Sequence, residues 1–144
     1  MMKKLSLLLV LLLLLGCNKS DDNNNCNFLL NVGVNLTVNI NLPQFSQLQF
    51  ANNPVRVEGQ GNEGLILIRG IGDNILAWDG ADPNHSPGPC SALQLNGIDA
   101  ECGCDDGNIY NLVTGQLVSQ TNQPCTLKPY RVESLGNNTF LVTN

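Results

Sequence analysis

The sequence predicts an all-β protein, an antiparallel β sandwich or partly open barrel that folds as a single domain. Apolar and polar residues alternate strictly over residues 31–42, and this period of two is typical of a half-buried strand. The Asn, Gly and Thr residues of the 144-residue chain, Asn above all, suit a turn-rich β protein better than a helical one. No stretch keeps a sustained helical period, and no internal repeat is present.

The first expected strand carries Val, Leu and Ile on one face and Asn, Gly and Thr on the other. Pro43 ends it, because proline cannot donate a hydrogen bond to a neighbouring strand. In the connection that follows, residues 44–53, we expect Phe45, Leu48 and Phe50 to reach the core from a loop or a helical turn.

The remaining strands are predicted as short segments separated by turn residues. Residues 65–69 are almost all apolar, which is typical of a strand covered on both faces. Gly136-Asn137-Asn138 is expected to close a terminal hairpin, because these residues accept positive φ angles. The other expected strands are residues 55–58, 75–78, 97–101, 108–112, 127–133 and 139–142.

The N-terminal residues 1–16 look like a lipoprotein signal peptide. Lys3 and Lys4 precede an apolar run that is too short for a transmembrane helix. The run ends in Leu14-Leu15-Gly16-Cys17, which resembles a bacterial lipobox. We therefore expect Cys17 to be lipidated, so that acyl chains anchor the protein in a membrane. The alternative is an ordinary signal peptide that ends in an incidental Cys.

Residues 17–27 are polar and Asn-rich and are expected to form a flexible tether before a folded domain at residues 28–144. Ser20-Asp21-Asp22 is similar to the acidic export signal of surface lipoproteins in Bacteroidetes, and a plain soluble linker is the alternative. The expected location is the outer membrane, at its periplasmic face or the cell surface, where disulfides persist. Nucleic acid is not expected as a partner, because the net charge is −5 and no basic run is present.

The stretch from Asp82 to Tyr110 contains the only His of the chain and three of its six Cys. Its frame, Asp82-Pro83-Asn84 followed by Cys102-Gly103-Cys104-Asp105, resembles the cluster-binding region of Rieske [2Fe-2S] proteins. In that family a Cys-x-His and a later Cys-x-x-His supply two thiolates and two imidazoles. The resemblance covers roughly residues 55–142, and its other pieces are Ala77-Trp78-Asp79, Thr114-Gly115, Pro124 and residues 127–132.

The resemblance implies a Rieske-like fold, but three of the four ligand positions are replaced. Only Cys102 keeps the residue of the family, while Asp82, Asn84 and Asp105 stand at the other positions. Asp and Asn are hard oxygen donors and poor replacements for Cys on an iron–sulfur cluster. The leader also lacks an arginine pair, so we expect export of an unfolded chain without a preassembled cluster. No cofactor is therefore expected, and [2Fe-2S] is the alternative.

No metal is expected either. If one binds, the candidate ligands are Cys102, His85, Asp82 and Asp105. His85 follows Asn84 by one residue, and in an extended loop this shift would point its ring away from the other ligand positions.

The resemblance also implies a disulfide between Cys90 and Cys104, which braces the two loops in many family members. Cys26 and Cys125 form a possible second pair if the ends of the chain that carry them adjoin. Cys102 would then be left as the odd thiol. The alternative is a redox-active dithiol of Cys102 and Cys104.

These features favour a membrane-anchored, Rieske-like lipoprotein without an iron–sulfur cluster. We expect it to be a non-enzymatic accessory or binding domain with a protein or glycan partner. One alternative is a Rieske-type [2Fe-2S] electron-transfer protein with atypical ligands. Another is a thiol–disulfide redox protein.

Overall fold

The computed structural model describes residues 25–144, so the predicted signal peptide, Cys17 and most of the predicted tether lie outside the described residues. Within that range the chain forms strands and two short 3-10 helices, and none of its helices is long and apolar enough to cross a membrane. The elements are β1 (Asn35–Asn39), η1 (Pro43–Gln49), β2 (Val55–Val57), β3 (Leu65–Arg69), η2 (Ile71–Asp73), β4 (Ile75–Asp79), β5 (Leu93–Asn96), β6 (Asp99–Cys102), β7 (Ile109–Asn111), β8 (Pro129–Gly136) and β9 (Thr139–Thr143).

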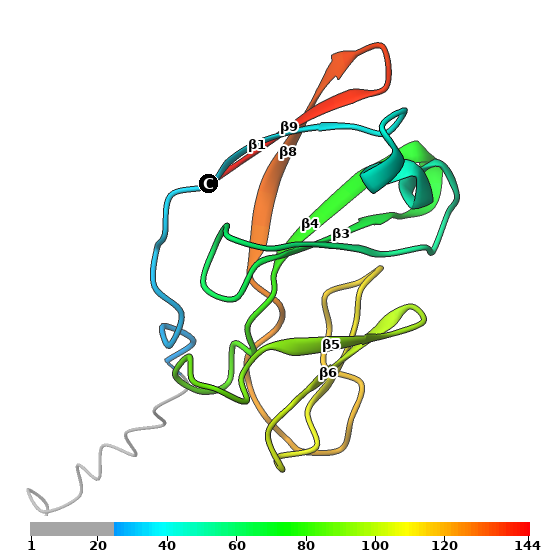
Figure 1. Ribbon diagram of the computed structural model, residues 1–144. Helices are drawn as coiled ribbons and strands as arrows, with labels where there is room; N and C mark the ends of the chain where they lie inside the picture. The colour runs from blue at the N-terminus through cyan, green and yellow to red at the C-terminus, as the bar shows by residue number, and fades with distance from the viewer. Residues whose placement is uncertain (1–24) are drawn as a thin grey trace, which may run out of the picture.

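Six strands form one curled antiparallel sheet in the order β1-β9-β8-β4-β3-β2 (Figure 1). The long strand β8 joins the two halves of this sheet. Its first residues, Pro129 and Tyr130, pair with Trp78 and Ala77 of β4, and the rest of β8 pairs with β9. The tip of the β8–β9 hairpin has positive φ angles at Gly136, Asn137 and Asn138, as the sequence predicts.

The remaining strands form a smaller antiparallel sheet in the order β5-β6-β7, which lies below the large sheet in Figure 1. Strands β5 and β6 make a tight hairpin in which Asn96 pairs with Asp99. Gly97 has a φ of 61°, which suits the first central position of a two-residue hairpin turn. Long loops connect this sheet to β4 before it and to β8 after it.

Strand β3 separates two hydrophobic clusters. Leu65 and Leu67 point into a cluster that also takes residues of β1, η1, β4, β8 and β9. Ile66 and Ile68 point to the other side, into a cluster with the small sheet. All four side chains have no exposed surface, which confirms that this strand is covered on both faces.

Trp78 ties the two sheets together. Its indole Nε1 donates a hydrogen bond of 2.8 Å to the carbonyl oxygen of Leu112, in the chain that follows β7. Gly115 lies against the same ring: a Cβ atom there would stand 2.7 Å from the Trp78 Cη2, and its φ is +72°. Only glycine accepts both the backbone conformation and the close approach.

The prediction of an all-β antiparallel fold is confirmed, with differences in detail. Within the segment 31–42 only Asn35–Asn39 is a strand, because β9 offers partners to those residues alone. Phe45 and Leu48 are buried in the core as expected, whereas the expectation for Phe50 is wrong, since its side chain is 64% exposed. Strand β5 was not predicted; only its first residue, Leu93, is buried, so its sequence carries little sign of a half-buried strand.

Candidate functional site

The candidate site lies where two loops meet at one end of the small sheet. The first loop, residues 80–92, joins β4 to β5, and the second loop, residues 103–108, joins β6 to β7. At the base of the first loop, Ala81 forms a bridge with Ala92. A disulfide between Cys90 and Cys104, with Cα atoms 4.8 Å apart, connects the two loops. The structure therefore contains the bridge that the family resemblance implies.

Asp82 is the centre of the hydrogen bonds between the loops. Its side chain is fully buried, yet both carboxylate oxygens have donors. Oδ1 accepts a hydrogen bond of 2.6 Å from the Tyr110 hydroxyl and one of 2.8 Å from the Asn84 N–H. Oδ2 accepts a hydrogen bond of 2.9 Å from Asn108 Nδ2. These donors compensate for the burial of a charged group, which would otherwise be strongly destabilising.

The same contacts set the protonation of this carboxyl. Burial by itself raises the pKa of Asp82. The hydrogen bonds from Tyr110, Asn108 and the Asn84 N–H outweigh burial and hold the pKa below its usual range. Burial and the Asp82 carboxylate in turn raise the pKa of Tyr110, so its hydroxyl remains a donor. Asp82 is therefore a carboxylate anion at neutral pH.

Asn84 connects the first loop to the chain before β8. Its Oδ1 accepts a hydrogen bond of 2.9 Å from the Cys125 N–H, and its Nδ2 donates one of 3.0 Å to the Cys125 carbonyl oxygen. Nδ2 also donates to the Tyr110 hydroxyl at 2.7 Å. The side-chain amide thus satisfies both backbone groups of a buried residue, which is a structural role.

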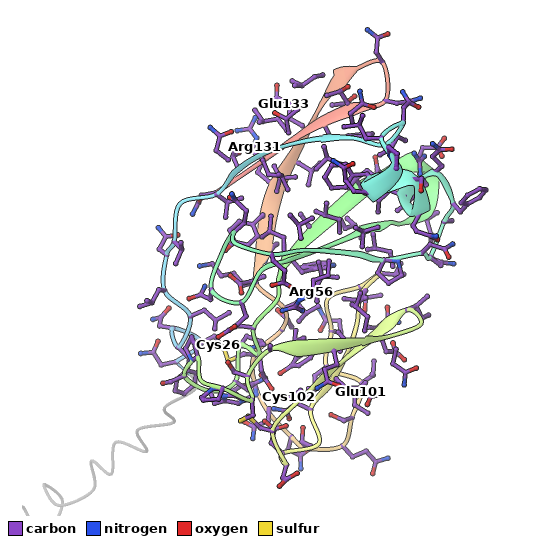
Figure 2. The ribbon with its side chains drawn as sticks, in the orientation of Figure 1. Cys26, Arg56, Glu101, Cys102, Arg131 and Glu133 are labelled. Atoms are coloured by element: carbon purple, nitrogen blue, oxygen red, sulfur yellow. A yellow bond between two sulfur atoms is a disulfide. The ribbon has the colours of Figure 1, made fainter. Side chains whose placement is uncertain are left out.

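The second disulfide brings the beginning of the described chain to the same place. Cys26 is joined to Cys125, with Cα atoms 5.5 Å apart. Figure 2 shows Cys26 and Cys102 near one end of the molecule, and Arg131 and Glu133 near the other end. From Cys26 the chain runs along one side of the protein to β1 (Figure 1). The point at which the chain enters the domain therefore lies beside the two loops.

His85 points toward the second loop, and the expectation that its ring points away is wrong. Its Nε2 lies 3.2 Å from the Cys102 Sγ and 3.2 Å from the Asp106 Oδ2. The loop is not extended at this point: the Asn84 N–H bonds back to the Asp82 side chain and turns the chain. The turn brings the residue after Asn84 over the second loop.

Cys102 is a free thiol within residues 25–144. Besides the contact with His85, its Sγ lies 3.5 Å from the Cys104 N–H. Burial and the carboxylates of Asp82 and Asp106 raise the pKa of this thiol, although the Cys104 N–H lowers it. Without a bound cation, Cys102 is thus protonated and a weak nucleophile at neutral pH.

The sequence named Asp105 as the candidate ligand of the second loop, but in the structure Asp106 is the carboxylate that faces the site. Asp105 is exposed, whereas Asp106 is partly buried and belongs to the group of possible ligands with His85, Cys102 and Cys104. Since Cys104 is in a disulfide, it offers no thiolate to that group. The choice between neighbouring carboxylates depends on the turn at residues 105–107, which the sequence pattern does not reveal.

The residues at this site do not match a [2Fe-2S] cluster of the Rieske type. Such a cluster needs two thiolates and two imidazoles. The chain has a single His, and Cys102 is the only free thiol among the described residues. Asp82 and Asn84, at two of the replaced positions, are engaged in the hydrogen bonds described above. The donor atoms that the structure brings together differ from that set: one imidazole, one free thiol and the Asp106 carboxylate.

Two residues that organise the site, Tyr110 and Asn108, could not be identified from the sequence. Both are buried and donate a hydrogen bond to Asp82, although Tyr110 is 28 positions and Asn108 is 26 positions from Asp82 in the sequence. The one available signal for Asn108 was its position, as a polar residue at the start of the predicted strand over residues 108–112. For Tyr110 the sequence offers no signal, since a tyrosine in a strand is an ordinary core residue.

No family model matches the chain, and no curated protein matches it. Among solved structures, a complex of reduced oxygenase and oxidised ferredoxin of carbazole 1,9a-dioxygenase is similar, with 20% identity over 78% of this chain and 93% of that chain and a TM-score of 0.48. A complex of a variant oxygenase with ferredoxin from the same system has 11% identity over 81% of this chain and 29% of that chain, with a TM-score of 0.45. These similarities concern the path of the backbone.

Proposed function

We propose that this protein is a membrane-anchored, Rieske-like accessory domain that lacks the iron–sulfur cluster and binds a partner without catalysing a reaction. One observation carries the proposal. At two of the replaced ligand positions, Asp82 and Asn84 hold the two loops and the Cys125 segment together through hydrogen bonds. Side-chain hydrogen bonds and a disulfide would then hold the two loops together, as the cluster does in the family.

The hydrogen bonds of Asp82 support a structural role for this side chain. Its Oδ1 accepts two hydrogen bonds and its Oδ2 accepts one, so both oxygens are engaged within the protein. The disulfide between Cys90 and Cys104 adds a covalent tie. The loops therefore form a rigid polar end of the molecule, and rigid surfaces lose less entropy on binding.

The position of the loops points to a partner near the membrane. Cys26 lies beside the loops, nine positions after Cys17, the expected lipid attachment site. An extended segment of this length spans at most about 30 Å. The loop end would thus stay close to the bilayer, where a membrane protein or a surface glycan is within reach.

A photo-crosslinking experiment in native membranes tests the partner and its location. A photoreactive residue at Ser86, which is exposed in the first loop, should give a discrete adduct with one partner. The matched control places the same residue at Asn137, which is exposed at the tip of the β8–β9 hairpin and should give none. Discrete adducts from Asn137 alone, or from neither position, would contradict binding through the loops.

An electron-transfer protein with an atypical metal centre is the second candidate, because His85, Cys102 and Asp106 converge. A redox-active metal would give the native protein a visible absorption band that disappears or shifts on reduction. The accessory role predicts no such band.

A thiol–disulfide enzyme is less well supported. Cys102 lies beside the Cys90–Cys104 disulfide, but its raised pKa disfavours the thiolate that such exchange requires. Titration of the native protein with a thiol reagent at neutral pH should therefore show slow modification of Cys102. Rapid modification, followed by exchange with the disulfide, would favour the enzyme.

A further inference from the structure

We propose that His85, Cys102 and Asp106 form a binding site for a single divalent metal ion of the zinc class at the junction of the two loops. The inference goes beyond the proposed function, since it requires neither a lipid anchor nor a partner. It concerns a mononuclear ion held by residues that are not at the family's ligand positions, apart from Cys102.

The distances fit one small ion. His85 Nε2 lies 3.2 Å from Cys102 Sγ and 3.2 Å from Asp106 Oδ2, and all candidate ligand atoms lie within 4.8 Å of one another. In a tetrahedral zinc site, bonds of about 2.0–2.3 Å place the ligand atoms about 3.3–3.8 Å apart. Shifts of less than about 1 Å would thus complete the three-ligand arrangement, with solvent at a fourth position.

The His85 ring is oriented as in a metal ligand. Its Nδ1 lies 3.1 Å from the Ser86 carbonyl oxygen, which can accept a hydrogen bond from that nitrogen. Its Nε2 faces the Cys102 sulfur and the Asp106 carboxylate, at 3.2 Å from each. With the ring proton on Nδ1, the Nε2 lone pair can bind a cation that Cys102 and Asp106 share. A backbone carbonyl that fixes the other nitrogen is the usual support of a ligating imidazole.

Asp106 provides the second, independent observation. Its Oδ2 is buried and accepts no hydrogen bond from the described residues, although it lies 3.2 Å from the His85 Nε2. The other oxygen, Oδ1, accepts a hydrogen bond of 3.1 Å from the Asn108 N–H, which fixes the carboxylate. Buried carboxylate oxygens normally have a partner, and a metal ion at the junction would supply it.

The charge and chemistry of the surroundings define the class of ion. Asp82 Oδ2 lies 3.6 Å from the His85 Nε2, so a second carboxylate adds negative charge behind the site, although its oxygens are already hydrogen-bonded. One imidazole, one thiolate and one carboxylate suit zinc and its neighbours in the first transition row. Calcium and magnesium prefer oxygen ligands alone. The ion would displace the proton of Cys102 on binding.

Cobalt(II) binding to the full-length protein tests this site. The protein is purified in detergent from an oxidising compartment, without a histidine tag, and stripped with a chelator before titration. We expect one Co²⁺ per chain and a thiolate-to-cobalt charge-transfer band, both abolished by one equivalent of Zn²⁺. In Cys102→Ser the band should disappear, and in His85→Gln and Asp106→Asn the affinity should fall at least about tenfold.

Asp105→Asn is the matched control, because Asp105 is the exposed neighbour of Asp106 and carries the same charge. It should bind Co²⁺ like the wild type. Zn²⁺ should also raise the melting temperature of the wild type and of Asp105→Asn, but not of Asp106→Asn, since a ligand of the folded state stabilises it. Equal affinities of Asp105→Asn and Asp106→Asn, a charge-transfer band retained in Cys102→Ser, or no saturable binding by the wild type would each overturn the proposal. Iron and sulfide in the native protein would instead contradict the proposed function.

Discussion

Replacing Tyr110 with Phe should destabilise the protein by about 2–4 kcal/mol, because it removes one hydroxyl from the centre of the two loops. The hydroxyl donates to Asp82 at 2.6 Å and accepts from Asn84 at 2.7 Å. A hydrogen bond to a charged group contributes about 1.5–3 kcal/mol and a neutral one about 0.5–1.5 kcal/mol. Asp82 and Asn84 each keep another partner, so the loss should stay within this range.

The effect should depend on pH in a defined direction. The folded-state pKa of Asp82 is lowered, so its ionised form stabilises the fold above the unfolded pKa of about 3.9 and loses this contribution as pH falls through the folded pKa. The Tyr110 hydrogen bond contributes to the lowered pKa, and its removal raises the folded pKa. The difference in unfolding free energy between variant and wild type should therefore be largest above about pH 5 and narrow toward pH 3.

Denaturant unfolding at several pH values measures this difference, and the expected fall in melting temperature at pH 7 is roughly 6–15 °C. Tyr130→Phe is the matched control: its hydroxyl donates to another buried carboxylate, Asp79, at 2.7 Å and makes no hydrogen bond to Asp82 or Asn84. Hydrogen exchange should accelerate in residues 82–85 in the Tyr110 variant only. An unchanged melting temperature, or a difference as large at pH 3 as at pH 7, would refute the role assigned to this hydroxyl.

Three further changes test other parts of the account. Cys90→Ser with Cys104→Ser opens a loop with a sequence separation of 14, so we expect a loss of about 3 kcal/mol in denaturant unfolding, and an unchanged midpoint would contradict it. Asn84→Ala leaves the buried Cys125 N–H without its partner and should lower the free energy of unfolding by about 1–3 kcal/mol. A smaller loss than the same substitution causes at an exposed Asn would argue against the structural role of the Asn84 hydrogen bonds. Cys17→Ala should prevent lipidation, so that the protein stays unprocessed or is released, and native protein in the aqueous phase of a detergent extraction would contradict the anchor.

Local patterns in the sequence predicted most of the sheet. Alternation and apolar runs located β1 and β3, because burial on one or both faces is recorded directly in residue order. Strand β5 has only four residues, and its strongest signal is the Asn96-Gly97 pair that begins the hairpin with β6. Phe50 was misplaced because it follows the last residue of η1 in extended backbone, where its ring points into solvent, whereas Phe45 and Leu48 lie within η1 and face the core.

The site was predicted only in part, because its contacts join distant residues. The family resemblance gave the two loops and the bridge between Cys90 and Cys104, which the structure contains. Turns within each loop determine where the His85 ring points and which carboxylate, Asp105 or Asp106, faces the site. Such turns are fixed by side chains that come from elsewhere in the fold, and a single sequence does not specify these partners.

The central claim is that hydrogen bonds and a disulfide organise the two loops in place of an iron–sulfur cluster. The most direct test is the iron and acid-labile sulfide content of protein purified from its own membranes, together with low-temperature EPR after reduction by dithionite. The account predicts a colourless protein without stoichiometric iron or sulfide and without a rhombic signal. Two irons and two sulfides per chain, with that signal, would contradict it.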